Sequence, residues 1–404
     1  MATSSSSPAA APATRPVTLG TPRVTPGSLL RLIRTGAARS RADLVALTGA
    51  PRSTVSARVE QLLAAKLVYE GGTGDSRGGR PPTLLAFNSK SGLVLAVDLG
   101  ATSAKVALTD LAGEFLGSLS REIEISDGPE PVLAVVNAMA DELLKDVGGG
   151  ATVKAVGVGV PGPVEFATGR LVHPPLMSGW HDYQVPQAFA RFACPVYVDN
   201  DVNVIAAGEL GTGGSDENFL VVKIGTGIGC GIVVHGQVYR GTQGCAGDIG
   251  HIYVPSEHTT ICRCGNENCL EAVAGGGAIA REAKARGLDV HGVKDLVRLA
   301  LQGEPPALEL VRNAGREIGG VLASLVNIFN PSRIVLVGSV AEAGNPLLAG
   351  IREVVYRRSL PLAARSLEIT ISDHGKIDGQ LGAARLAIES LLDDDRVDAE
   401  LEAV

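Results

Sequence analysis

Apolar residues recur at helical spacing in three short segments near the N-terminus, at residues 26–35, 40–47 and 51–65. The turn Thr48-Gly49-Ala50 separates the second segment from the third, and Ser40 is a residue type that caps helices. The third segment carries a single apolar stripe, formed by Val55, Val59, Leu62 and Leu63. The pattern predicts three helices, with a tight turn between the last two.

The opposite side of the third predicted helix is polar. Its side chains are hydroxyls and guanidiniums of the kind that reach phosphates and base edges, namely Arg52, Ser53, Thr54, Ser56 and Arg58. Two strand-like runs follow, at residues 67–70 and 83–87, around a tip rich in glycine and proline that contains Arg77 and Arg80. This order predicts a winged helix-turn-helix that binds double-stranded DNA. The alternative is a module for protein interaction or dimerisation.

The charge distribution changes the balance between these two readings. The chain carries a net charge of −7, but residues 15–90 hold 12 basic and 4 acidic side chains and therefore carry +8, which leaves −15 for the rest. A basic module attached to an acidic body favours DNA binding over a solvated basic surface. Aromatic residues make up only 3% of the chain, so stacking on single-stranded nucleic acid would have few platforms.

Beyond residue 88, strand-like runs alternate with helical patterns. The apolar run at residues 93–98 predicts a strand buried on both faces, and the end of this strand and the turn after it contain Asp98, Gly100 and Thr102. A second run, at residues 220–224, leads into Gly225, Thr226 and Gly227. A carboxylate followed by a glycine turn and a hydroxyl begins phosphate and magnesium sites in several α/β folds. Two such turns predict a duplicated α/β domain that closes on one nucleotide, unless both are only hairpin turns.

Between these turns, residues 196–199 read as a strand that leads into Asn200 and Asp201, with a helix expected at residues 205–210. At such a position Asp201 would take a proton from a sugar hydroxyl as a general base, while Asn200 would hold the sugar ring. The alternative is that both residues only cap the following helix.

One histidine and three cysteines lie close together further along the chain, at His251, Cys262, Cys264 and Cys269. An imidazole and three thiolates make a closed tetrahedral zinc site with no open position, which is typical of a structural metal. The alternatives are a cluster of small buried residues or a disulfide. The chain has six cysteines and no secretory signal pattern, which favours the metal. Glu271 ends the same loop, so zinc would hold His251 and Glu271 on one wall of a cleft.

Length and composition indicate how the chain is divided. A chain of 404 residues predicts two or three domains. We expect a disordered tail at 1–24, the winged helix-turn-helix at 25–88, a first α/β lobe at 89–205, a second lobe with the zinc loop at 206–390, and an acidic tail at 391–404. The C-terminal helix of the second lobe is expected to pack back on the first lobe. No apolar run is long enough to span a membrane, which predicts a cytoplasmic protein.

The order of these motifs resembles the ROK family of repressors, open reading frames and kinases, in its regulator branch, over residues 26–388. The motifs are the winged helix with Gly-Gly-Arg-Pro, D-x-G-x-T, Val-Pro-Gly-Pro-Val, Asn-Asp, Gly-Thr-Gly, Gly-Asp-Ile-Gly-His and C-x-C-G-x3-C-x-E. The resemblance implies a two-lobed, actin-like (ribonuclease H-like, sugar kinase) duplicated α/β body that assembles as a homodimer or homotetramer. It also implies zinc ligands at the four residues named above, and phosphate binding at the two glycine turns. Sugar contacts are implied at Asn200, Asp201, Asp248, His251 and Glu271.

The sequence departs from the family's sugar kinases at several positions. Those kinases usually have Gly-Gly-Thr-Lys where this chain has Gly100-Ala101-Thr102-Ser103, and Glu where it has Asp248. We therefore expect a sugar-responsive repressor of genes for carbohydrate uptake or catabolism, which senses a monosaccharide or its phosphate and binds an operator. The alternatives are a DNA-binding protein that still phosphorylates a hexose with ATP and magnesium, with Asp201 as the base, and a sugar kinase whose N-terminal module serves only assembly.

Overall fold

A computed structural model describes residues 24–73, 83–147, 150–210, 217–256, 258–375 and 378–403. The chain forms two compact units. One comprises the N-terminal residues up to Ala86 together with the segment from Asp398 onwards, and the other comprises Phe87–Val397. In the described part of the chain, no helix is both long enough and apolar enough to cross a membrane.

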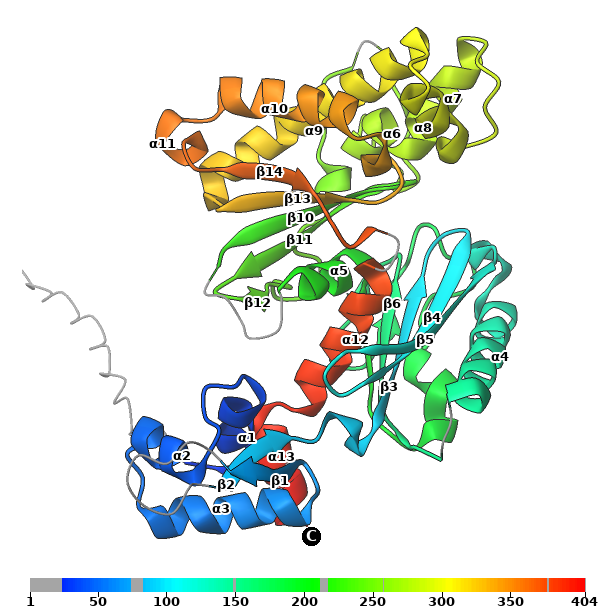
Figure 1. The fold of residues 1–404 in the computed structure, drawn as a ribbon. Coiled ribbons are helices and arrows are strands. Elements are labelled where there is room, and N and C mark those ends of the chain that lie inside the picture. The colour runs from blue at the N-terminus through cyan, green and yellow to red at the C-terminus, as the bar shows by residue number, and fades with distance from the viewer. Residues whose placement is uncertain are drawn as a thin grey trace, which may run out of the picture. The chain divides into compact units, whose positions relative to one another are not determined.

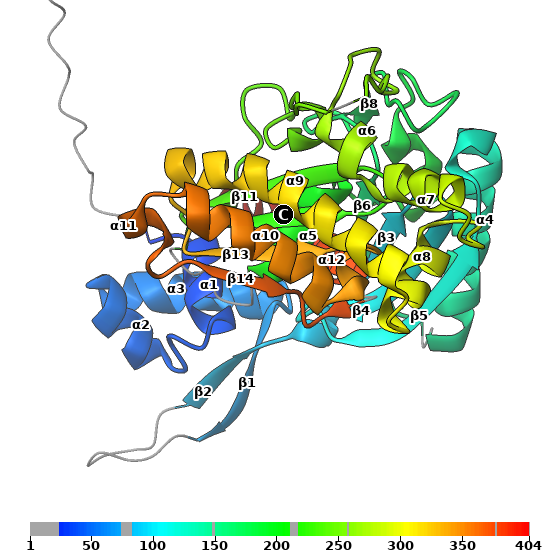
Figure 2. The ribbon, with the colours of Figure 1, turned by 90° about the horizontal axis from the view of Figure 1, so that it is seen from above.

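The first unit contains the three predicted helices and a hairpin, α1 (Pro26–Arg34), α2 (Arg41–Thr48), α3 (Arg52–Ala64), β1 (Val68–Thr73) and β2 (Thr83–Phe87). A capping box at Thr25 precedes α1, and Ser40 is the N-cap of α2, where its side chain accepts a hydrogen bond from the backbone nitrogen of Asp43. Gly49 ends α2 at φ 68°, a conformation that favours glycine. The apolar stripe of α3 packs inward at Val55, Val59 and Leu62. Strands β1 and β2 pair as a hairpin (Figure 2).

The C-terminal acidic segment differs from expectation, because it forms a helix and belongs partly to the first unit. Helix α13 spans Asp394–Glu402. Its Asp398 carboxylate accepts a hydrogen bond of 2.8 Å from the backbone nitrogen of Gly27 at the start of α1. A carboxylate at the N-terminus of a helix satisfies one of the backbone N–H groups that have no partner within the helix. The acidic composition suggested a tail because it gave no hint of this partner.

The second unit is built on two five-stranded sheets with the same layout (Figure 1). The first sheet has the order β5-β4-β3-β6-β9, from β3 (Leu93–Leu99), β4 (Ser103–Asp110), β5 (Phe115–Glu122), β6 (Val153–Val160) and β9 (Val196–Asn200). The second has the order β12-β11-β10-β13-β14, from β10 (Phe219–Ile224), β11 (Ile228–Val234), β12 (Gln237–Val238), β13 (Arg333–Val337) and β14 (Glu368–Ile371). In each sheet three antiparallel strands continue into two parallel ones. This repetition is the predicted duplication.

Helices cover both sheets. Helix α4 (Pro129–Val147) packs on the first sheet, and α9 (Pro305–Phe329) and α10 (Asn345–Arg358) pack together above the second (Figure 1). The remaining helices are α5 (Asp201–Glu209), α6 (Leu270–Ala274), α7 (Gly276–Ala285), α8 (Val293–Leu301), α11 (Pro361–Ala364) and α12 (Asp378–Leu391). The short elements are β7 (Val164–Glu165), β8 (Arg170–Leu171), η1 (Ser89–Ser91), η2 (Ile125–Asp127), η3 (Val185–Phe192), η4 (Ile249–His251) and η5 (Ala341–Ala343).

Helix α12 returns from the second sheet to pack on β3 and β6 of the first, and it crosses α5 on the way. The crossing is close because glycines meet there. A Cβ at Gly208 of α5 would lie 3.1 Å from the Cα of Gly382 of α12. At Gly157 of β6, a Cβ would lie 2.8 Å from the carbonyl carbon of Ala383. Because glycine has no side chain, the backbones of β6, α12 and α5 can approach one another closely at these positions.

Candidate ligand site and metal centre

Asp201 begins helix α5 and forms an ion pair with a residue that the sequence did not single out. The Nζ atom of Lys223, on β10, lies 2.5 Å from Oδ2 of Asp201. Asp201 is 8% exposed. Burial raises the pKa of Asp201 and Lys223 opposes this shift, while the negative charge of Asp98 adds to it. Burial also acts to lower the pKa of Lys223, but the charges of Asp201 and Asp98 outweigh it and the pKa is raised. Asp201 is therefore held by a cation from the second sheet.

Both predicted glycine turns are hairpin turns, at equivalent places in the two sheets. The first connects β3 to β4, and the nitrogen of Gly100 donates to the carbonyl of Ser103 at 2.8 Å. The second connects β10 to β11, where the nitrogen of Gly225 donates to the carbonyl of Gly227 at 2.9 Å. Thr102 and Thr226 are exposed, whereas Asp98, at the end of β3, is buried. The hairpin alternative is thus correct as a description of the backbone, and it leaves a hydroxyl free at each turn.

Asn200 serves as the N-cap of α5, as the alternative reading expected. Its Oδ1 accepts a hydrogen bond of 3.0 Å from the nitrogen of Val202, and its Nδ2 donates to the carbonyl of Gly162 at 3.1 Å. The helix starts at Asp201 and not near residue 205 as predicted. Capping fixes the amide of Asn200 but leaves it one N–H and one lone pair for a ligand.

The preceding residue, Asp199, is the hub of a buried network that sequence reasoning missed. Its carboxylate accepts hydrogen bonds from the nitrogen of Asn200 at 2.8 Å, from Nδ2 of Asn203 at 3.0 Å and from Nε of Arg240 at 2.7 Å. The guanidinium of Arg240 also stacks over Phe166, with 3.9 Å between its carbon and the ring centroid. Asp199 is 3% exposed, so this pairing replaces its lost hydration. The network ties β9 to the loop after β12.

The four predicted zinc ligands come together. The ligand atoms of His251, Cys262, Cys264 and Cys269 all lie within 4.8 Å of one another. The sulfurs of Cys264 and Cys269 are 3.6 Å apart, and the sulfur of Cys262 is 3.8 Å from Nδ1 of His251. A tetrahedral zinc ion with Zn–S bonds of about 2.3 Å needs ligand separations close to these. All six cysteines are free thiols, so the disulfide alternative does not hold. The cluster could hold a metal ion.

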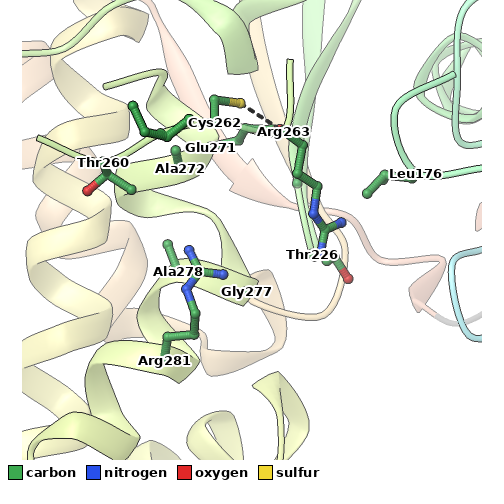
Figure 3. A pocket seen from close by; sticks show the side chains of 12 residues that line it. Leu176, Thr226, Thr260, Cys262, Arg263, Glu271, Ala272, Gly277, Ala278 and Arg281 are labelled. Atoms are coloured by element: carbon green, nitrogen blue, oxygen red, sulfur yellow. Dashed lines mark hydrogen bonds between the residues drawn. The ribbon is translucent and has the colours of Figure 1, made fainter. Parts of the chain in front are cut away.

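The metal cluster and the second glycine turn share Glu271. Its Oε1 accepts a hydrogen bond of 3.4 Å from the thiol of Cys262 (Figure 3). A Cβ at Gly227 would lie 2.5 Å from Oε2 of Glu271, so a side chain there would displace the carboxylate from its present position. Asp248 precedes His251 and is exposed. Although the residue is exposed as a whole, neighbouring groups partly desolvate its carboxyl, which raises the pKa of Asp248; His251 opposes this shift and the charge of Glu271 adds to it.

The match to a family model decides which family the fold and site belong to. Residues 94–390, which make up most of the chain, match the model described as the ROK family. The chain belongs to the ROK family. Its resemblance to this family is therefore confirmed, and the two-sheet α/β body is the ROK body.

Relatives of this ROK protein include both repressors and kinases. It is 31% identical to the xylose repressor of Bacillus spizizenii over 369 residues, which cover 90% of this chain and 95% of the repressor. It is 34% identical to the glucokinase of Halalkalibacterium halodurans, over 72% of this chain and 94% of the kinase. A crystal structure of a ROK family transcriptional regulator, described as a homologue of the E. coli MLC protein, superposes with a TM-score of 0.80 at 26% identity. The superposition covers 94% of this chain and 98% of the regulator's chain. The match to the repressors therefore includes the N-terminal region, as the regulator branch requires.

A cavity of about 260 Å3 in the ROK body adjoins Glu271 and the second glycine turn (Figure 3). Thr226, Gly227 and the start of the metal loop line it, and Leu176 of the first lobe lies at its edge. Two exposed arginines also line it: Arg263, which lies between Cys262 and Cys264, and Arg281 on α7. Sequence reasoning missed both, although an arginine inside a metal loop is a signal that could have been followed. Guanidiniums suit an anionic ligand group.

The predicted DNA-contacting residues of the ROK protein lie on α3 or outside the described residues. Arg52 and Ser53 are exposed in the first turn of α3, and Thr54, Ser56 and Arg58 are half-buried. Arg58 bonds Gln61 through a contact of 3.1 Å on the same helix. The wing-tip residues Arg77 and Arg80 fall outside the described residues, since residues 74–82 are not among them.

Proposed function

We propose that this ROK protein is a sugar-responsive, DNA-binding transcriptional repressor of genes for carbohydrate uptake or catabolism. The observation that carries the proposal is the similarity to a xylose repressor over nearly the full length of both chains, including the N-terminal unit. The basic charge of residues 15–90 and the exposed polar residues at the start of α3 support DNA binding.

In this proposal, α3 enters the major groove of a double-stranded operator. Arg52, Ser53, Thr54, Ser56 and Arg58 contact bases or phosphates, and Arg77 and Arg80 of the wing contact the minor groove. A palindromic operator requires two copies of the unit, which a homodimer or homotetramer supplies.

The sugar or sugar phosphate would bind against Asn200, Asp201, Asp248, His251 and Glu271. The geometry supports this, because Asn200 is fixed by its cap and Glu271 by the metal loop. The cluster of His251, Cys262, Cys264 and Cys269 would hold a structural zinc ion, which fixes the loop that presents His251 and Glu271. The two arginines of the adjoining cavity would favour a phosphate group on the ligand.

A ligand that touches both lobes binds the closed form better, and only such a difference in affinity shifts the equilibrium between forms. Helix α12 packs on the first sheet, and the chain then continues through α13, whose Asp398 bonds α1 of the DNA-binding unit. This continuous path gives closure of the lobes a route to the DNA-binding unit.

The test combines a ligand screen with a DNA-binding titration. A panel of monosaccharides and their phosphate esters is screened by thermal shift, because a ligand of the folded form raises Tm by mass action. Binding to a fragment of the gene's own promoter is then measured over a range of salt concentrations with and without the best ligand. We expect affinity that falls steeply with salt and changes with the ligand. A protein that binds no DNA, or whose DNA binding no sugar alters, would not be a sugar-responsive repressor.

The second candidate function is an ATP-dependent hexose kinase that retains a DNA-binding unit, which the 34% identity to a glucokinase favours. In that reading Asp201 is the base, and Asp98, Gly100, Thr102, Gly225, Thr226 and Gly227 bind the phosphates of ATP with magnesium. The repressor relatives and the Asp201–Lys223 pair favour a protein that is not an enzyme. Sugar-dependent release of ADP at about 1–100 per second, lost in Asp201→Asn, would establish the kinase.

A further inference from the structure

Two carboxylates lie in poorly hydrated surroundings in the proposed sugar cleft. Asp98 ends β3 of the first sheet and is 9% exposed, and Asp201 begins α5 and is 8% exposed. The negative charge of Asp98 adds to the effect of burial in raising the pKa of Asp201. Ionised carboxylates in such surroundings need a cation nearby.

Lysine side chains provide that cation from within the chain. Lys223 is the one charged residue of β10, in the run Phe219–Ile224, and its Nζ is 2.5 Å from Asp201. Lys105 of β4 forms an ion pair with the other carboxylate, since its Nζ is 3.6 Å from Oδ2 of Asp98. The two carboxylates and two ammonium groups balance in charge.

This donor set does not fit magnesium. Magnesium takes six oxygen ligands at about 2.0–2.1 Å, several of them waters, and one or two protein carboxylates supply the negative charge that holds it. Here an ammonium group already contacts each carboxylate, and a divalent ion placed between them would meet two positive charges. The residues that would hold magnesium in a sugar kinase are present, but their charge is already neutralised.

We propose that Lys223 is a built-in cation that replaces a divalent metal between Asp98 and Asp201, so that this ROK protein binds its sugar without magnesium and does not use Asp201 as a base. The statement about sugar rests on the proposed function, whereas the statement about the metal does not. If Asp201 accepted a proton from a sugar hydroxyl, the half-buried ammonium of Lys223 would lose its counter-charge, which opposes the transfer.

The experiment compares the full-length, zinc-loaded protein with two variants. Lys223→Met removes the charge and keeps a side chain of similar length, and Lys223→Arg keeps the charge. Thermal unfolding is recorded with and without magnesium chloride, at an ionic strength matched with sodium chloride and without chelator. We expect the Tm of the wild type and of Lys223→Arg to be unchanged by magnesium. The Tm of Lys223→Met should be lower and should rise with magnesium by about 2 °C or more.

Two results would overturn the proposal. One is a wild type that magnesium stabilises as much as it stabilises Lys223→Met, and the other is a Lys223→Met protein that does not respond to magnesium. Should Lys223→Met not fold, Lys223→Gln replaces it. The double variant Lys223→Met, Asp201→Asn removes both charges and should fold without a magnesium response.

A separate arm measures sugar binding. Calorimetric titration with D-xylose and D-glucose, with and without magnesium, should give dissociation constants that agree within about twofold for the wild type. A dependence of tenfold or more on magnesium would contradict the proposal. If neither sugar nor any other member of the panel binds, the proposed function fails, while the thermal experiment still decides the role of Lys223.

Discussion

Gly382 lies where α12 crosses α5, and replacing it with alanine should force the two helices apart. A Cβ at Gly382 would lie 2.5 Å from the carbonyl carbon of Val204, closer still to its oxygen, and 3.1 Å from the nitrogen of Ile205. These atoms belong to the backbone of α5, so no side-chain rotation relieves the collision. The alanine variant can form only if α12 moves.

The expected cost follows from two opposing effects. Adding a methyl group to a packed interior costs about 1–3 kcal/mol, and a collision with backbone places Gly382→Ala near the upper end. Alanine has a greater helix preference than glycine, which offsets about 1 kcal/mol of this cost. We therefore expect Gly382→Ala to lower the free energy of unfolding by about 2 kcal/mol.

Gly320→Ala in α9 is the matched control, because a Cβ there would meet only the guanidinium of Arg358, at 3.7 Å. It should be as stable as the wild type or more stable by up to about 1 kcal/mol. Urea unfolding of the full chain, followed by circular dichroism, gives the midpoint urea concentration of both variants. We expect the slope of the unfolding free energy against urea concentration to equal that of the wild type. A Gly382→Ala midpoint equal to that of Gly320→Ala would refute the claim that the crossing depends on backbone contact.

Three further predictions concern the metal, the operator and pH. Purified wild type should contain close to one zinc ion per chain, and Cys264→Ser should lose both the zinc, measured by mass spectrometry, and the response to sugar. Arg52→Ala should weaken operator binding by about 1–3 kcal/mol in a fluorescence titration and leave Tm unchanged. Burial raises the pKa of Asp378 from its ordinary value of 3.8 to about 6, so the folded chain keeps a proton there that the unfolded chain loses. Stability should therefore fall as pH rises from about 4 to 6, and Asp378→Asn should flatten the dependence of Tm on pH in this window.

Local patterns were sufficient to predict the helices of the first unit and the clustering of His251 with three cysteines. The helices of the first unit begin and end within about two residues of the predicted positions, because caps such as Ser40 and Gly49 act through neighbouring backbone groups. The members of this cluster were predictable because three of the four lie within eight positions of one another in the sequence.

Partners distant in sequence were not predictable in the same way. Asp199 and Arg240 meet across 41 positions, and Asp398 meets Gly27 across 371, so no local spacing reveals either pair. Lys223 did give a signal that was not followed. A lysine within an otherwise apolar buried strand needs a carboxylate partner, and Asp201 was already a candidate site residue.

The bond between Asp398 and Gly27 also affects when the first compact unit is completed during synthesis. Residues 398–404 belong to the same compact unit as α1 to α3, but they follow the entire ROK body in the chain. At a translation rate of about 5–20 residues per second, α1 waits roughly 15–60 s for this partner after β2 has been made. A nascent chain therefore acquires its complete first unit only after the ROK body has been synthesised, and a chain that terminates before Asp398 lacks that final contact.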